Sequence, residues 1–332
     1  MRASAYAILL AALSGLVVLT FVGSLLIGPS DLGMAGSLEG LFSTETSLAQ
    51  LVMYEIRLPR AVLGLMIGVT LGLSGAVLQG FLRNPLAEPG ILGISSAAAL
   101  GAVLAIYTGL SAFFPLALPL AGLAGAFVAV LLIRALTGAN GSTLTLILAG
   151  VAVSAFAGAA STLVLNLSPN PFAATEILFW MLGSLTDRSM THVWLAGPFM
   201  IIGWIMLASL ARPLDTLTLG SDAAATMGIN VGKLQSFAVF GTAASVGAAV
   251  SVAGAIGFVG LVVPHVLRPL VGSVPSRLLP ASALGGAIVL LTADILVRLI
   301  DPGHDLKIGV LTAMVGAPFF LWLVYRSRRN EL

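Results

Sequence analysis

The sequence contains no cysteine and very little charge. Only 8% of its 332 residues are Asp, Glu, Lys or Arg, whereas 58% are hydrophobic. The absence of thiols excludes disulfides, thiolate catalysis and cysteine metal sites. The scarcity of charge, together with a mean hydropathy of +1.09, excludes a water-soluble domain and predicts a protein that crosses the membrane many times.

Motifs for catalysis, metal binding and ATP binding are also missing. The chain has no HExxH and no GxSxG, and its three histidines, His192, His265 and His304, are far apart in sequence. The string nearest to a phosphate loop ends at Lys233, but it lacks the first glycine of GxxxxGK and the Ser or Thr that follows the lysine. We therefore predict no catalytic residue and no metal site. Nucleic-acid binding is not expected, because the basic residues stand singly and form no patch.

Ten apolar runs are long enough, or nearly so, to cross a bilayer core, which takes about 20 helical residues. The run at 258–272 is short and contains Pro264, so by itself it could also be re-entrant. The first run could be a signal peptide, but it is longer than a signal h-region and no small-x-small cleavage site follows, so we expect an uncleaved span. The runs are 5–27, 58–82, 91–109, 113–134, 142–167, 191–210, 233–256, 258–272, 278–299 and 308–325.

Charge decides how many of these runs cross. With ten crossings and a cytoplasmic N-terminus, ten of the 15 Lys and Arg residues lie at inner ends, as the positive-inside rule requires. A non-spanning 258–272 would place Arg326, Arg328 and Arg329 outside, against that rule. We therefore predict an all-α integral membrane protein with about ten transmembrane helices, both termini cytoplasmic, and a single polytopic domain over 1–332. The inner basic residues are Arg2, Arg83, Arg134, Arg212, Lys233, Arg268, Arg277, Arg326, Arg328 and Arg329.

Two parts of the chain share a layout. Gly-rich helices at 61–82 and 236–256 are each followed by a broken segment that contains proline, NPLAEPG and GFVGLVVPH. In the ten-span arrangement these helices cross in opposite directions, which predicts an inverted repeat. A glycine-rich composition alone could also produce this likeness.

Two polar segments connect the runs. Residues 168–190 contain two prolines and the aromatic pair Phe179 and Trp180, which predicts either a short interfacial helix on the outer face or an ordinary loop anchored by aromatics. Residues 211–233 form the longest polar stretch on the inner face. There, Asp215 and Ser221 are candidate N-caps of two short helices, separated by Gly220 and closed by Gly228; a plain loop is the alternative.

The stretch from Arg57 to Gly93 is the most informative. It begins with RLPR, continues as a helix with glycine at every fourth position (Gly64, Gly68 and Gly72), and breaks at RNPLAEPGILG. Such glycines let neighbouring helices approach closely, so we expect this helix in the middle of the bundle. These motifs, in this order, resemble the permease family of ABC importers for iron-siderophore complexes, haem and vitamin B12. GFVGLVVPHVLRPLVG at 257–272 and GVLTAMVGAPFFLWL at 309–323 extend the resemblance, and GHDLKIGV at 303–310 departs from it.

The resemblance implies the partners and the mechanism. It implies a homodimer in the bacterial inner membrane that imports a metal chelate (a ferric siderophore, haem or cobalamin) by alternating access. Two ATP-binding subunits and a soluble binding protein, periplasmic or lipid-anchored, would complete the system. No cofactor is expected on this chain, because ATP and Mg belong to the partner ATPase.

The resemblance also implies the roles of particular residues. It assigns docking of the binding protein to Arg57, Arg60 and Arg298, and the cytoplasmic gate to Asn84, Leu86, Ser142 and Thr143. It makes 211–233 the segment that couples to the ATPase. The residues implied in coupling are Leu214, Asp215, Thr216, Leu217, Gly220, Ser221, Asp222, Ala225, Met227 and Gly228.

Each of these sites also has a purely structural interpretation. The arginines could pair with Glu55 and Asp294 or extend toward the interface, and Ser142 could be only an N-cap. An ion-coupled secondary transporter of a small amphipathic solute is the alternative function. The lack of a buried relay argues against it, because Asp294 is the only acid well inside an apolar run and stands four residues before Arg298.

Overall fold

The computed structural model describes residues 3–28, 33–42, 47–138, 141–168, 170–300 and 306–330. His304 and the first part of the departing segment GHDLKIGV lie outside them. All regular structure in the described residues is helical, so the predicted all-α fold is confirmed. Within these ranges, seven helical stretches are long and apolar enough to cross a membrane. They contain α1 (Ala3–Leu26), α4 (Leu58–Phe81), α7 (Ala117–Thr137), α8 (Thr143–Asn166), α10 (Met190–Ala208), α13 (Val231–Ala253) and α15 (Pro275–Ile300).

Three shorter apolar helices occupy the remaining predicted runs. They are α5 (Ile94–Tyr107), α14 (Val259–Leu267), which continues into the 3-10 helix η3 (Pro269–Val271), and the Ile308–Leu323 part of α16 (Ile308–Asn330). The α14 helix has only nine residues and contains Pro264. At about 1.5 Å per residue it is too short to cross a bilayer core alone.

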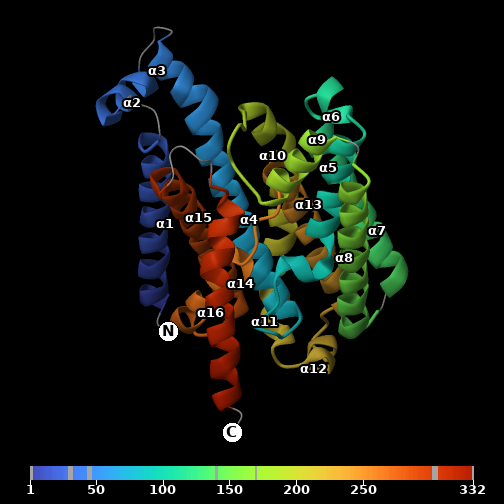
Figure 1. Cartoon of the computed structure of the whole chain (residues 1–332). Helices are drawn as coiled ribbons and strands as arrows, with labels where there is room; N and C mark the ends of the chain where they lie inside the picture. Colours follow the sequence, from blue (N-terminus) through green and yellow to red (C-terminus); the bar gives the residue numbers. More distant parts are fainter. Residues whose placement is uncertain are drawn as a thin grey trace.

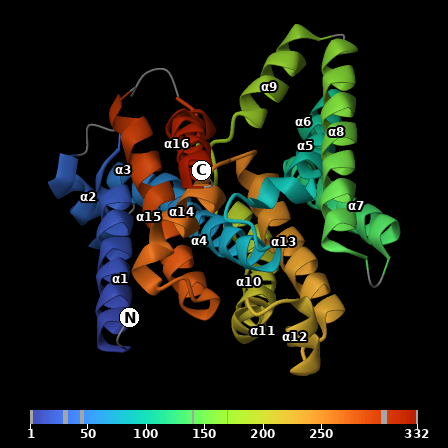
Figure 2. The ribbon, with the colours of Figure 1, turned by 90° about the horizontal axis from the view of Figure 1, so that it is seen from below.

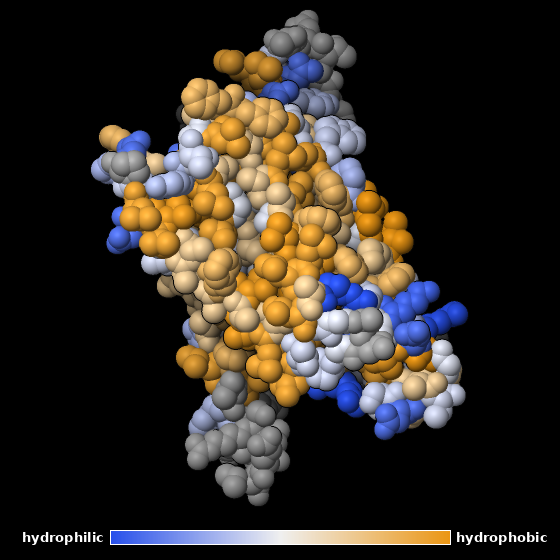
Figure 3. Space-filling view, turned by 90° about the vertical axis from the view of Figure 1, so that its right-hand side faces the viewer, coloured by the Kyte–Doolittle hydropathy of each residue, from blue (hydrophilic) through white to orange (hydrophobic). Residues whose placement is uncertain are grey.

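The first residues of α1 and the last residues of α16 lie on the same side of the molecule, where Figure 1 marks N and C. The short helices α11 (Ala211–Leu217) and α12 (Ser221–Thr226) lie at that end, while α2 (Gly33–Phe42), α3 (Leu48–Leu51), α6 (Leu110–Phe113) and α9 (Pro171–Met181) lie at the other. The predicted short helix within 168–190 is thus present as α9. On the face shown in Figure 3, hydrophobic residues form a broad band and hydrophilic ones gather toward the ends, as expected for a chain in a bilayer.

The α4 helix forms the centre of the bundle. It contacts α1, α10, α13, α14 and α15, and Figure 2 shows it crossing between the two halves of the molecule. Its approach to α15 depends on glycine, since a Cβ on Gly68 would meet the backbone of Gly286 and a Cβ on Gly72 would overlap the carbonyl of Ser282. Gly64 instead faces the side chain of Leu291. The backbones of α4 and α15 therefore pack directly against each other.

A π-helical segment, η1 (Val52–Arg57), leads into α4. Pro59 in the first turn of α4 has no N–H to donate back to the preceding turn. The backbone widens there, and Leu58 N–H donates to the Met53 carbonyl instead. This widened turn ends at Arg57.

The two broken segments follow helices that run in opposite directions. The α4 helix descends from the end that carries α3, whereas α13 rises from the end that carries α12 (Figure 1). After α4 come the loop 82–88, the 3-10 helix η2 (Pro89–Leu92) and α5; after α13 come the non-helical residues 254–258 and α14. This is the layout expected of an inverted repeat.

Candidate functional site

The arginines at the outer end bind the chain's own groups. Arg57 donates to the carbonyls of Leu25 (2.9 Å) and Leu26 (3.0 Å), and Arg298 donates to those of Ser24 (2.9 Å) and Ile27 (2.6 Å). These carbonyls are at the C-terminal end of α1, where the helix leaves acceptors unpaired and its dipole is negative. Both side chains are buried, with 4% of Arg57 and 6% of Arg298 exposed.

Asp294 joins two of these arginines. Its carboxylate lies 2.8 Å from Arg60 Nε and 2.7 Å from Arg298 Nη2, and the residue is fully buried. Arg60 and Arg298 therefore pair within the chain, through Asp294, as one of the alternatives above predicted. Arg57 bonds instead to the α1 carbonyls and to Ser37 Oγ (2.8 Å). Arg60 is the more accessible of the two arginines paired with Asp294, with 12% of its side chain exposed against 4% for Arg298. We define Arg57, Arg60, Arg298 and Asp294 as the outer arginine cluster.

The inner loop after α4 is held by backbone turns. Asn84 Oδ1 accepts from Leu86 N–H (2.9 Å), and Asn84 N–H donates to the Gln79 carbonyl (3.1 Å). Asn84 is exposed and Leu86 is half-buried. The second predicted gate segment begins α8, where Ser142 Oγ accepts from Thr145 N–H (3.1 Å), so Ser142 is the N-cap.

The chain that follows the first gate segment contacts α8, the helix that begins at the second gate segment. Gly93, just before α5, packs against the carbonyl of Gly150 and the backbone of Ser154 in α8. Its φ of +72° and this close approach both favour glycine. The contact places η2 and the start of α5 beside the first half of α8, which the sequence does not show.

The inner helices α11 and α12 exist, but their predicted N-caps are wrong. The α11 helix begins at Ala211, so Asp215 lies inside it, and the Asp215 carboxylate accepts from Ser276 N–H (2.8 Å) in the first turn of α15. Gly220, with φ of +110°, takes the N-cap position before Ser221. Gly228, with φ of +85°, follows α12 as predicted. Tertiary contact with α15 fixes Asp215, and local sequence does not reveal it.

Of the ten residues assigned to coupling, two are buried, five are exposed and three (Asp215, Thr216 and Gly220) are half-buried. Leu214 and Leu217 are buried at 0% and 3% exposure, and Leu214 packs on Gly80 at the inner end of α4. These two leucines therefore hold the segment against the bundle. The residues that face outward are Ser221, Asp222, Ala225, Met227 and Gly228.

Sequence reasoning missed a polar network around the start of α14. Gln79 Nε2 donates to the Leu261 carbonyl (3.2 Å), and Arg268 Nη2 donates to Gln79 Oε1 (2.7 Å). Glu88, in the loop after α4, bonds to the backbone of Phe258. Gln79 and Glu88 both lie in the stretch that carries the family resemblance, but only the fold brings them to α14.

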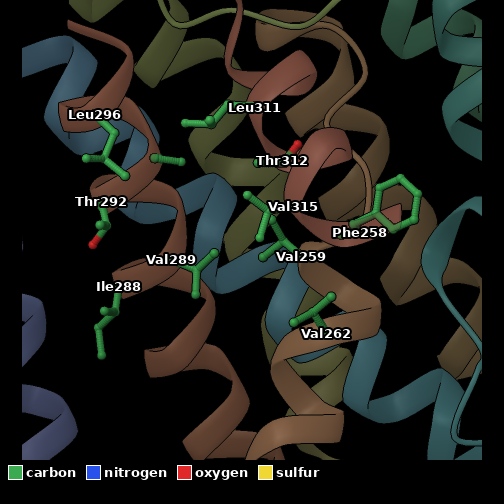
Figure 4. Close-up of a pocket in the computed structure, with 12 residues that line it drawn as sticks. Phe258, Val259, Val262, Ile288, Val289, Thr292, Leu296, Leu311, Thr312 and Val315 are labelled. Atoms are coloured by element: carbon green, nitrogen blue, oxygen red, sulfur yellow. The ribbon is translucent and has the colours of Figure 1, made fainter. Parts of the chain in front are cut away.

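An apolar cavity of about 380 Å³ lies between α14, α15 and α16. Figure 4 shows Val259 and Val262 of α14 opposite Val289 and Leu296 of α15, with Val315 of α16 between them. Two threonines, Thr292 and Thr312, are the polar residues in its lining. No group of His, Cys, Asp or Glu in the described residues is arranged to hold a metal ion.

Known proteins similar to this chain are permeases. The model of the FecCD transport family matches residues 16–326. The chain is 41% identical over 277 residues to the Fe(3+) dicitrate transport system permease protein FecD of Escherichia coli K12, covering 83% of this chain and 86% of that protein. It is 40% identical over 282 residues to the vitamin B12 import system permease protein BtuC of Salmonella paratyphi A, covering 84% and 85%.

A solved structure shares the fold. It is described as an inward-facing conformation of a metal-chelate type ABC transporter, with a TM-score of 0.84, 33% identity, and coverage of 96% of this chain and 98% of that one. These likenesses decide against the ion-coupled secondary transporter, because ABC permeases work with a separate ATPase and a substrate-binding protein. The chain belongs to the FecCD transport family and is a multi-pass inner-membrane permease subunit of an ABC importer, a transport component and not an enzyme.

Proposed function

We propose that two copies of this chain enclose a path through which a metal chelate enters the cell. The family match over residues 16–326 carries this proposal. Two relatives at about 40% identity are named for Fe(3+) dicitrate and for vitamin B12, and both compounds hold a metal ion within a larger organic complex. The substrate class is therefore a ferric siderophore, haem or cobalamin. In this mechanism an ATP-driven change in the ATPase opens the path alternately to each side.

Each end of the chain has a proposed role. The outer arginine cluster attracts acidic groups of the soluble binding protein, since charge complementarity directs encounter and orientation. Within the cluster, the partial exposure of Arg60 makes it the direct contact, while Arg57 and Arg298 hold its surroundings in place. Asn84, Leu86, Ser142 and Thr143 close the inner end, and the exposed face of α12 docks into the ATPase.

Reconstitution tests the proposal. The permease and its ATPase are placed in proteoliposomes, and uptake of a labelled ferric siderophore, haem and cobalamin is measured with and without the binding protein and ATP. We expect one of the three to accumulate only when ATP and the binding protein are both present. An imposed proton or sodium gradient serves as the control. Accumulation driven by the gradient alone, without ATP, would refute the proposal.

The dimer and the substrate need separate measurements. The mass of the purified permease in nanodiscs should correspond to two copies, and a single copy in the active complex would contradict the shared path. The ligand that copurifies with the binding protein identifies the chelate. A ligand without a metal would overturn the substrate class and leave the ABC mechanism intact.

A further inference from the structure

The α14 helix begins inside the bundle and not at a membrane surface. Residues 254–258 before it are not helical, and Phe258 has φ of +66°. Phe258 packs on Gly316 of α16, and the carbonyl of Gly260 packs on Gly75 of α4. The first N–H groups of a helix have no partner within it, and an unpaired one is costly where water is excluded. Val259 N–H donates to the Gly257 carbonyl (2.9 Å) and Leu261 N–H donates to the Phe258 carbonyl (3.1 Å). The N–H of Phe258 itself takes its acceptor from another segment.

Glu88 supplies the acceptor for the N–H of Phe258. Its carboxylate accepts a hydrogen bond from the backbone N–H of Phe258, the residue that precedes α14. Glu88 is extended, with φ −133° and ψ 161°, as favoured before proline, and the ring of Pro89 packs against Gly260. Glu88 and Phe258 also line a cavity of about 100 Å³ between the two broken segments. An anion at a helix N-terminus is stabilised by the helix dipole.

Gln79 makes a second connection to the same turn. Its amide donates to the Leu261 carbonyl, and Arg268 holds the other end of the amide. Gln79 lies in α4 just before the inner loop 82–88, and Glu88 is the last residue of that loop. Asn84 N–H, in the loop, donates to the Gln79 carbonyl. The loop is thus fixed to α14 at both of its ends, once through each side chain.

We propose that Glu88 is a positioning residue that makes the inner loop 82–88 and α14 move as one body during transport. The α14 helix forms one wall of the 380 Å³ cavity in Figure 4. Movement of the loop that carries Asn84 and Leu86 would therefore reach the interior of the bundle directly. This inference rests on the proposed function, because it concerns how the inner end of the path is linked to its middle.

Substitution of Glu88 tests the link through transport. Glu88→Gln keeps the shape but removes the charge, and Glu88→Ala removes the acceptor. We expect both variants to assemble with the ATPase and to bind the binding protein as before. The ATP hydrolysed per substrate imported should rise about tenfold, the change expected when a charge-assisted hydrogen bond is weakened or lost. Glu39→Gln, an exposed acid in α2, is the matched control and should leave this ratio unchanged.

Spin labels test the link through distance. Because the chain has no cysteine, labels can be placed on Arg83→Cys in the loop and Val266→Cys in α14, both exposed. In the otherwise unchanged complex, we expect the same label distance without nucleotide and with ATP bound. In Glu88→Gln the distance should broaden or shift between these states.

Two results would overturn the inference. One is a label distance that already changes with ATP when Glu88 is present. The other is a Glu88 variant that assembles poorly but whose assembled complexes hydrolyse the same amount of ATP per substrate imported as the unsubstituted complex. Glu88 would then be merely structural. Failure of the proposed function is a different result, since it would appear as absent ATP-dependent uptake with Glu88 intact.

Discussion

Asp294 balances the positive charge at the outer end of the bundle. It is fully buried in contact with Arg60 and Arg298. Removing one member of a buried ion pair leaves a buried charge without its partner, at a cost of about 3–5 kcal/mol. We therefore expect Asp294→Asn to unfold at a clearly lower temperature in detergent. Glu55→Gln changes an exposed acid in η1 and is the control, which should unfold at the same temperature as the unsubstituted chain. If Asp294→Asn also unfolds at that temperature, Asp294 is not a buried member of an ion pair.

Arg60 and Arg57 differ in what substitution should do. Arg60→Gln keeps hydrogen-bonding capacity and removes a charge that is partly exposed, so we expect slower association with the binding protein and weaker dependence of that rate on salt. Assembly with the ATPase should not change. Arg57→Gln removes bonds to the α1 carbonyls and should lower stability.

The association rate of Arg60→Gln with the binding protein is measured by surface binding kinetics at two salt concentrations. The stability of Arg57→Gln is measured by thermal unfolding. If Arg60→Gln associates at the unsubstituted rate at low salt, Arg60 has no docking role.

The contact of α4 with α15 depends on the absence of a side chain. A Cβ on Gly72 would overlap the Ser282 carbonyl, and close-packed helices accommodate added atoms only by moving apart. We expect Gly72→Leu to reduce the yield of folded, monodisperse protein severely, and Gly72→Ala to do so less. Gly15→Ala in α1 is the control, because nothing lies within 4 Å of its added Cβ. Equal yields for Gly72→Leu and Gly15→Ala would contradict this packing.

The exposed face of α12 should carry the contact with the ATPase. Met227 is 63% exposed, whereas Leu214 and Leu217 are buried. We expect Met227→Asp to abolish copurification of the ATPase, since a charge replaces an apolar contact that docking would desolvate. Met227→Leu preserves the apolar surface and should retain the ATPase. Retention of the ATPase by Met227→Asp, measured by affinity copurification, would place the contact elsewhere.

The two ends of the whole molecule should lie on opposite sides of the membrane. Because the chain has no cysteine, single cysteines report this directly. Ser221→Cys in α12 and Phe172→Cys in α9 are both exposed. In intact cells, an impermeant thiol reagent should label Phe172→Cys only, and in inside-out vesicles Ser221→Cys only. Labelling of both in intact cells would contradict a crossing by α10, the helix that separates the two sites.

Much of the architecture could be predicted from local sequence. Length and hydropathy locate the apolar runs, and the positive-inside rule sets their parity, because both effects depend on transfer between water and lipid and not on tertiary contacts. The spacing of Gly64, Gly68 and Gly72 indicated a helix packed closely by its neighbours. The N-cap Ser142 could also be predicted from local sequence, since the side chain of an N-cap bonds to the first turn of its own helix.

The sites could be predicted only in part. The arginines were located at the outer end, and pairing with Asp294 was one of the stated alternatives. The bonds of Arg57 and Arg298 to carbonyls at the end of α1 were not foreseen, because these acceptors are about 30 to 270 positions away in sequence. Asp215 looked like a local cap, yet it binds the first turn of α15. Local patterns carry no information about such distant partners.

The amino-acid sequence by itself determined that this protein is an all-helical membrane protein with many crossings, because hydrophobic length and charge distribution are properties of each segment alone. Only the tertiary structure decided which polar groups meet inside the bundle. Glu88 reaches Phe258, and Asp294 reaches Arg60, because the interior of the bundle offers little water to these groups and each must find its partner on another segment of the chain.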